Sequence, residues 1–163
     1  MAIIDFHIPK ELDKKEPYVW LASWFGFGFL RPAPGTWGSL GALPFGLLIY
    51  IFGGINILYA CIIIFTIIGL WAAAKFDKAM NGHDSKMIVI DEVVGQWIAL
   101  VPTALNPILI IVSFLFFRVF DILKPWPVSF FDKDVDGAAG VMCDDIVAGL
   151  MAAVCVMGLD ALI

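Results

Sequence analysis

Six ionisable residues in three short clusters carry most of the chemistry in this sequence: Asp91-Glu92, Arg118 with Asp121, and Asp144-Asp145. Each cluster adjoins a long uncharged stretch, and an ionisable group at the edge of a membrane segment usually marks a functional site. Five carboxylates and one guanidinium cannot share a low-dielectric pocket in ionised form unless cations join them or their pKa values rise. Because no His or Cys belongs to the set, the excess negative charge predicts a hard divalent cation, Mg²⁺ or Mn²⁺.

A phosphate group is the expected companion of this cation, because Mg²⁺ commonly binds a few carboxylates together with phosphate oxygens. The available basic partners are Arg118, Lys124 and Arg31. Arg31 belongs to a glycine-rich loop, residues 25–39, in which backbone N–H groups and hydroxyls can approach an anion. The tryptophans of this region, at positions 20, 24 and 37, are expected to form an interfacial belt.

The composition is that of a membrane protein. Of 163 residues, 61% are hydrophobic and 15% are charged, against about 25% charged in soluble domains. Uncharged runs cover Trp37–Ala74, Val93–Phe117 and Ile146–Leu159. A net charge of -5 without a basic run excludes a nucleic-acid binder, and the hydrophobicity excludes a disordered chain. Three cysteines cannot all pair, which excludes a disulfide-stapled secreted domain and indicates structural thiols.

The basic residues give the topology. All ten lie in three segments, at positions 10–31, 75–86 and 118–133, whereas the connections at residues 53–56 and 102–107 have none. Since cytoplasmic loops accumulate Lys and Arg, the three segments are predicted inside and the two neutral turns outside. The predicted fold is an all-α polytopic membrane bundle of about five transmembrane or half-membrane helices, at Gly38–Phe52, Ile55–Lys75, Met87–Pro102, Pro107–Leu123 and Val141–Leu159.

We expect one integral-membrane domain over residues 1–163. Residues 1–35 form a cytoplasmic or interfacial leader with the glycine-rich loop, and residues 36–163 form the bundle. No cleavable signal peptide is visible. The segment 87–123 is either one span or a hairpin that turns between Pro102 and Pro107; the hairpin is preferred because it keeps every basic residue on one side and brings Glu92 close to Arg118.

Several blocks, taken in order, resemble the phosphatidylglycerophosphatase A family over about residues 25–150. They are Gly26–Gly28, Pro34-Gly35-Thr36, Gly38-Ser39-Leu40, His83-Asp84, Ile88-Val89, Asp91-Glu92, Gly95, Trp97, Phe117-Arg118, Asp121, Lys124-Pro125-Trp126-Pro127, Asp132, Gly137, Gly140, Met142, Asp144-Asp145-Ile146 and Ala148-Gly149. Because these blocks keep the family's order, chance similarity is a poor explanation.

The resemblance implies a Mg²⁺-dependent enzyme of phospholipid biosynthesis in the bacterial inner membrane, multi-pass with a cytoplasmic active site. It would hydrolyse phosphatidylglycerophosphate, a lipid phosphate monoester, to phosphatidylglycerol and inorganic phosphate. Oligomeric state, metal count and headgroup selectivity stay open. The acyl chains are expected to enter between helices at Gly95 and Gly149, where small residues permit close packing.

Within that resemblance, we expect the following roles. Metal ligands would be Glu92, Asp121, Asp144 and Asp145, with Asp91 and Asp84 as outer-shell or second-metal candidates. Asp145 is the expected proton acceptor, with Asp91 as a further catalytic candidate. Arg118, Lys124 and Arg31 would neutralise phosphate oxygens, and Thr36 and Ser39 would add hydrogen bonds.

Two other classes of protein compete with this interpretation. A membrane phosphotransferase of the CDP-alcohol type also uses clustered aspartates and a divalent metal, but its motif requires an Arg that is absent after Gly137. A cation channel or transporter would favour acids near the membrane midplane, whereas these acids cluster at predicted cytoplasmic helix ends.

Overall fold

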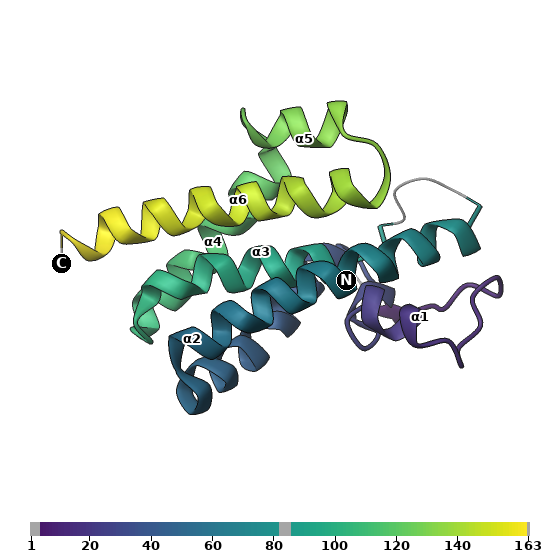
Figure 1. The fold of residues 1–163 in the computed structure, drawn as a ribbon, viewed down its shortest axis with the longest axis horizontal. Coiled ribbons are helices and arrows are strands. Elements are labelled where there is room, and N and C mark those ends of the chain that lie inside the picture. The colour runs from purple at the N-terminus through teal and green to yellow at the C-terminus, as the bar shows by residue number, and fades with distance from the viewer. Residues whose placement is uncertain (1–3, 82–85, 163) are drawn as a thin grey trace.

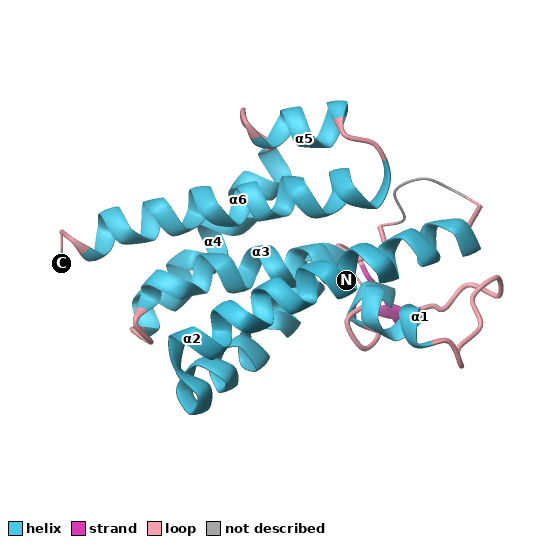
Figure 2. Ribbon diagram, in the orientation of Figure 1, coloured by secondary structure: helices cyan, strands magenta, loops and turns pink. Residues whose placement is uncertain are grey.

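The computed structural model describes residues 4–81 and 86–162, and nearly all of its regular structure is helical (Figures 1 and 2). In chain order the elements are β1 (Asp5–Phe6), α1 (Pro17–Ala22), η1 (Phe27–Phe29), β2 (Leu30–Arg31), α2 (Pro34–Ala79), α3 (Ile90–Leu100), η2 (Val101–Thr103), α4 (Pro107–Leu123), α5 (Val128–Asp134) and α6 (Gly137–Asp160). The two short strands pair antiparallel, with Asp5 opposite Arg31. The predicted all-α class is confirmed, and the strand pair and α5 are additions to it.

Helix α2 consists of two helical arms joined at Gly54. Gly54 has φ 74° and ψ 176°, a conformation that favours glycine because it has no Cβ. The arms fold back on each other, because Trp24 contacts both Phe45 of the first arm and Phe65 of the second, at ring-centroid distances of 5.3 and 5.6 Å. The turn predicted at residues 53–56 is therefore confirmed.

The segment 87–123 is a hairpin, as predicted, and the single span is wrong. Helix α3 ends at Leu100, and Ala104 and Leu105 then adopt positive φ values of 47° and 64°. Asn106 caps α4, because its side-chain oxygen accepts a hydrogen bond from the Ile108 N–H at 2.9 Å. Helix α3 begins at Ile90 rather than at Met87, because the preceding Val89 is not helical and donates its N–H to the Ala22 carbonyl.

Helix α3 is the centre of the bundle and packs between α2 and α6 (Figure 1). Nine of its 11 residues are buried. The Trp97 indole N–H donates to the Ala42 carbonyl at 2.8 Å, which ties α3 to the first arm of α2. Trp24 also packs on Trp97 and is 2% exposed, so its predicted place in an interfacial belt is wrong.

The outer surface of the helices suits a membrane. By length and composition, α2 and α6 could each cross one. Large apolar side chains are more than half exposed on α2, α4 and α6: Leu48, Ile51, Phe52, Ile63, Ile64, Ile67, Ile108, Ile111, Leu115, Ile122, Leu123, Leu150, Val154 and Met157. An apolar surface of this extent indicates membrane association.

Helices α3 and α6 meet backbone to backbone at Gly95 and Gly149. A Cβ on Gly149 would overlap the Gly95 carbonyl oxygen, and a Cβ on Gly95 would lie 2.6 Å from the Asp145 carbonyl oxygen and 2.5 Å from the Phe117 ring. Small residues permit such close approach in membrane bundles. The expected entry of acyl chains at this point is wrong, because the contact leaves no gap.

We expect Gly149→Ala to destabilise the protein by about 1–3 kcal/mol, because backbone atoms on both sides must move to admit the methyl group. The matched control is Gly158→Ala on the same helix, where a Cβ would meet no atom within 4 Å. The control should change the unfolding free energy by no more than about 0.5 kcal/mol. Thermal unfolding in detergent measures both, and equal Tm values would contradict the tight α3–α6 contact.

Candidate active site

A polar cavity of about 610 Å³ opens where five helices come together. Its walls come from the start of α2, the first turn of α3, the end of α4, α5 and the first turns of α6. All three ionisable clusters singled out in the sequence line it. Among the residues that the structure describes, seven carboxylates (Asp91, Glu92, Asp121, Asp132, Asp136, Asp144 and Asp145) and three cations (Lys86, Arg118 and Lys124) line the cavity.

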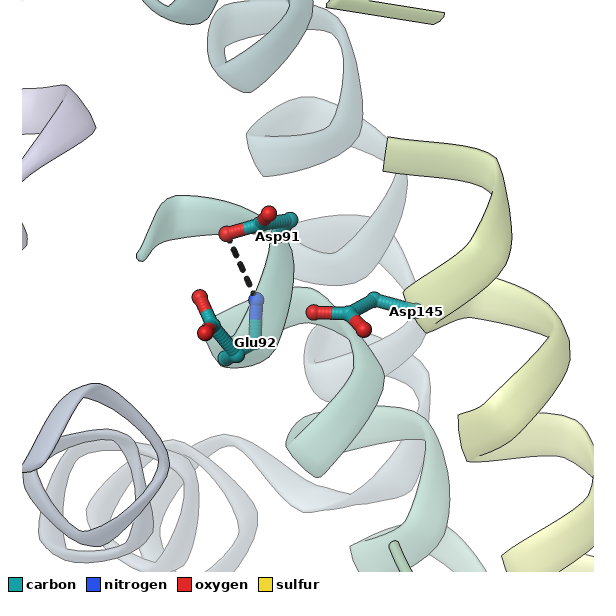
Figure 3. A group of neighbouring side chains, drawn as sticks. All are labelled: Asp91, Glu92 and Asp145. Atoms are coloured by element: carbon teal, nitrogen blue, oxygen red, sulfur yellow. Dashed lines mark hydrogen bonds between the residues drawn. The ribbon is translucent and has the colours of Figure 1, made fainter. Parts of the chain in front are cut away.

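Three of these carboxylates form a compact acidic group. Asp91, Glu92 and Asp145 each offer one oxygen atom, and these atoms all lie within 4.8 Å of one another. Asp145 extends from α6 toward the first turn of α3, where Asp91 accepts a hydrogen bond from the Glu92 N–H at 3.0 Å (Figure 3). Asp91 and Asp145 are only 6% and 3% exposed. The arrangement has the donor type and spacing of a hard divalent cation site.

Asp144, next to this group in sequence, has hydrogen-bond partners of its own. One of its oxygens accepts a hydrogen bond from the Lys124 ammonium at 2.6 Å, and the other accepts from the Asp145 N–H at 2.9 Å. Lys124 also pairs with Asp132 of α5. Burial by itself would lower the pKa of Lys124, but the two carboxylates outweigh burial and raise this pKa, so the ammonium stays charged.

Arg118 is held on two sides at the end of α4. Its Nη1 lies 2.5 Å from Asp121 Oδ2, and the same nitrogen donates to the Ser39 hydroxyl at 3.2 Å. Ser39 in turn donates to the Gly35 carbonyl at 2.9 Å. These contacts position the guanidinium against the wall of the cavity formed by the start of α2.

Two buried polar atoms at the cavity have no hydrogen-bond partner among the described residues: Glu92 Oε2 and Arg118 Nε. Buried polar atoms are normally paired, so an unpaired acceptor and an unpaired donor both require explanation. A carboxylate oxygen suits a metal cation, and a guanidinium N–H suits a phosphate oxygen. Together they fit a site that binds a cation and an oxyanion side by side.

Three of the predicted site residues that the structure describes do not line the cavity. Arg31 is exposed on β2, where strand pairing places it opposite Asp5, so its predicted phosphate contact is not supported. Thr36 is absent from the cavity wall, and Ser39 is fully buried behind Arg118. Asp84 lies outside the described residues.

Asp132 and Gly35 are among the contributors to the site that were not assigned a role from the sequence. Asp132 was recognised only as part of a family block, and its pairing with Lys124 depends on the turn that folds α5 back against α6. Gly35 adjoins the site directly, because a Cβ there would overlap the Glu92 carboxylate and lie 3.3 Å from Arg118 Nη1. The sequence shows Pro34 and Gly35 at the start of α2, but it does not show that Glu92 and Arg118 lie next to Gly35 in space.

Comparison with known proteins supports the motif-based resemblance. The family model for Phosphatidylglycerophosphatase A matches residues 20–160. The chain is 35% identical over 152 residues to Phosphatidylglycerophosphatase A of Haemophilus influenzae, covering 93% of each protein. It is 39% identical over 144 residues to the protein of that name from Escherichia coli, covering 87% of this chain and 83% of the relative.

A third relative has a different name. The chain is 37% identical over 139 residues to a Putative phosphatidylinositol-3-phosphatase of Bacteroides thetaiotaomicron, covering 81% of this chain and 86% of the relative. No solved structure gives a significant match. Since the family match covers most of the sequence and includes every acid of the compact group, the chain belongs to the phosphatidylglycerophosphatase A family.

Proposed function

We propose that this protein is a Mg²⁺-dependent lipid phosphatase that hydrolyses phosphatidylglycerophosphate to phosphatidylglycerol and inorganic phosphate. The observation that carries the proposal is the pair of unpartnered buried atoms, Glu92 Oε2 and Arg118 Nε, in one acidic cavity of a chain from this family. A cation beside the first and a phosphate oxygen beside the second would satisfy both atoms.

In this proposal, Asp91, Glu92 and Asp145 are the principal residues that hold Mg²⁺. This set differs from the sequence-based expectation, in which Asp91 was an outer-shell or second-metal candidate and Asp121 and Asp144 were ligands. Asp91 replaces those two residues because Asp144 is paired with Lys124 and Asp121 is paired with Arg118. Asp121 and Asp144 remain close enough to act on Asp145 electrostatically and would contribute through water. The metal supplies positive charge that neutralises the phosphate oxygens.

Side chains of the cavity perform phosphate binding and proton transfer. Arg118 binds phosphate oxygens through the guanidinium edge left free by Asp121, and Lys124 adds a second fixed positive charge. Asp145 accepts a proton from the attacking water as its oxygen bonds to phosphorus. The ester P–O bond then breaks, the leaving alkoxide takes up the proton that Asp145 accepted and departs as phosphatidylglycerol, and inorganic phosphate is released.

We further propose a multi-pass protein of the bacterial inner membrane with its active site on the cytoplasmic side. Lys86 and Lys124 line the cavity, and Lys78 and Lys133 belong to the same basic segments. Because such segments stay on the cytoplasmic side, the cavity mouth would face the cytoplasm. A cation channel is less well supported, because the acids gather at one end of the helices. A CDP-alcohol phosphotransferase is also less well supported, because the family model that matches this chain is that of another family.

Headgroup selectivity provides a second candidate substrate. The Bacteroides thetaiotaomicron relative is named for a phosphatidylinositol phosphate. Both lipids present a phosphate monoester on a lipid headgroup, so the same cavity chemistry applies to each. Phosphate release from the two lipids, measured in parallel with purified protein, decides between them.

Asp145→Asn and Asp121→Asn should each lower phosphate release from phosphatidylglycerophosphate at least about a hundredfold, because each removes charge next to the proposed metal. The matched control is Asp160→Asn, an exposed acid at the far end of α6, which should keep the native rate. Removal of divalent metal with EDTA should abolish turnover, and Mg²⁺ should restore it. Near-native rates in both site variants would refute the assignment.

Arg118→Lys should lower kcat about 10²–10³-fold, because an ammonium cannot pair with Asp121 and a phosphate oxygen in the fixed geometry of a guanidinium. Arg31→Lys serves as the control, since Arg31 is exposed and does not line the cavity. Steady-state phosphate release measures both variants. Equal losses in the two variants would contradict the specific role of Arg118.

A further inference from the structure

An apolar groove lies on the outer side of α6, separate from the acidic cavity. It has a volume of about 410 Å³ and is formed by Phe120 of α4, Pro127 before α5, and one face of α6 from Val147 to Cys155. None of the residues that line it carries a charge, a hydroxyl or an amide side chain. Leu150 and Val154 on this face are 52% and 68% exposed, so the groove is open along its length.

The groove begins beside the acidic cavity. Phe120 directly precedes Asp121, and Val147 follows Asp145 by two residues, so two of the groove residues adjoin residues of the cavity wall. From Val147 to Cys155 the groove follows α6 for about 12 Å, at 1.5 Å per residue. That length covers most of one leaflet, whose hydrocarbon is about 15 Å deep.

The route to the cavity between α3 and α6 is closed. Between α3 and α6, the backbones of Gly95 and Gly149 are in contact, and no acyl chain fits there. A lipid whose phosphate lies in the cavity must therefore leave its chains elsewhere, and the groove between α4, α5 and α6 begins at residues that adjoin the cavity wall in sequence.

We propose that this groove is a subsite for one acyl chain of the phospholipid substrate, an inference that rests on the proposed lipid phosphatase function. Because the groove and the bilayer interior are both hydrocarbon, transfer of a chain between them gains little free energy. The groove instead fixes the lipid's position, so that its phosphate monoester lies against Arg118 and the compact acidic group. The subsite thus makes the reaction depend on chain length.

The test compares two forms of phosphatidylglycerophosphate in the same mixed micelles, one with 16-carbon chains and one with four-carbon chains. Leu150→Trp fills the groove from an exposed position, and Val154→Trp fills it nearer its far end. Each should lower kcat/KM about tenfold for the long-chain lipid and leave the short-chain value within about twofold. The matched control, Met157→Trp, lies on α6 beyond the groove and should change neither value.

Unchanged long-chain rates in both Trp variants would overturn the subsite, as would equal losses on the two lipids. If the native protein released phosphate from neither lipid, the proposed function itself would fail; release without the predicted chain dependence would reject only the groove. The remaining occupant is a second copy of this chain. Oxidation of the Cys61→Ser, Cys143→Ser double variant in membranes tests this occupant, because Cys155 lines the groove. A dimer linked through Cys155 would overturn the lipid assignment. A monomer without a crosslink supports the lipid assignment.

Discussion

Repulsion among buried carboxylates is the constraint on which the rest of this structure depends. Asp91, Glu92 and Asp145 meet in a cavity whose walls carry more acids than bases. Within the described residues, Arg118 and Lys124 offset Asp121, Asp132 and Asp144 through direct ion pairs. Among residues 4–81 and 86–162 the compact group has no such ion pair, so in its ionised form helix packing must hold it together against its own charge. A bound divalent cation would relieve this repulsion.

Glycines make the approach of these acids possible. At Gly35 the start of α2 comes against Glu92, and at Gly95 and Gly149 the backbones of α3 and α6 touch. Because Gly95 follows Glu92 by three residues and Gly149 follows Asp145 by four, the close contact lies one helical turn from the acids. The same contact that brings the carboxylates together also closes this side of the bundle to lipid.

The arrangement separates polar from apolar functions along α6. Its first turns contribute Asp144 and Asp145 to the cavity, and the following turns present apolar side chains to the groove and the surface. A lipid phosphate ester has the same division, with a charged headgroup and hydrocarbon chains. The headgroup site proposed at these polar helix ends therefore exposes no charge to the bilayer interior.

The sequence by itself determined the helical class, the turn at Gly54, the hairpin between α3 and α4, the three ionisable clusters and the family, because hydropathy, glycine and proline signals and ordered motifs are local. Only the tertiary structure decided that Asp91 joins Glu92 and Asp145, that Asp132 pairs with Lys124, and that Arg31 stays outside the cavity. Spacing along a helix gives the face on which a residue lies, but not the rotation and depth at which that face meets its neighbours. Those depend on packing between segments that are distant in the chain.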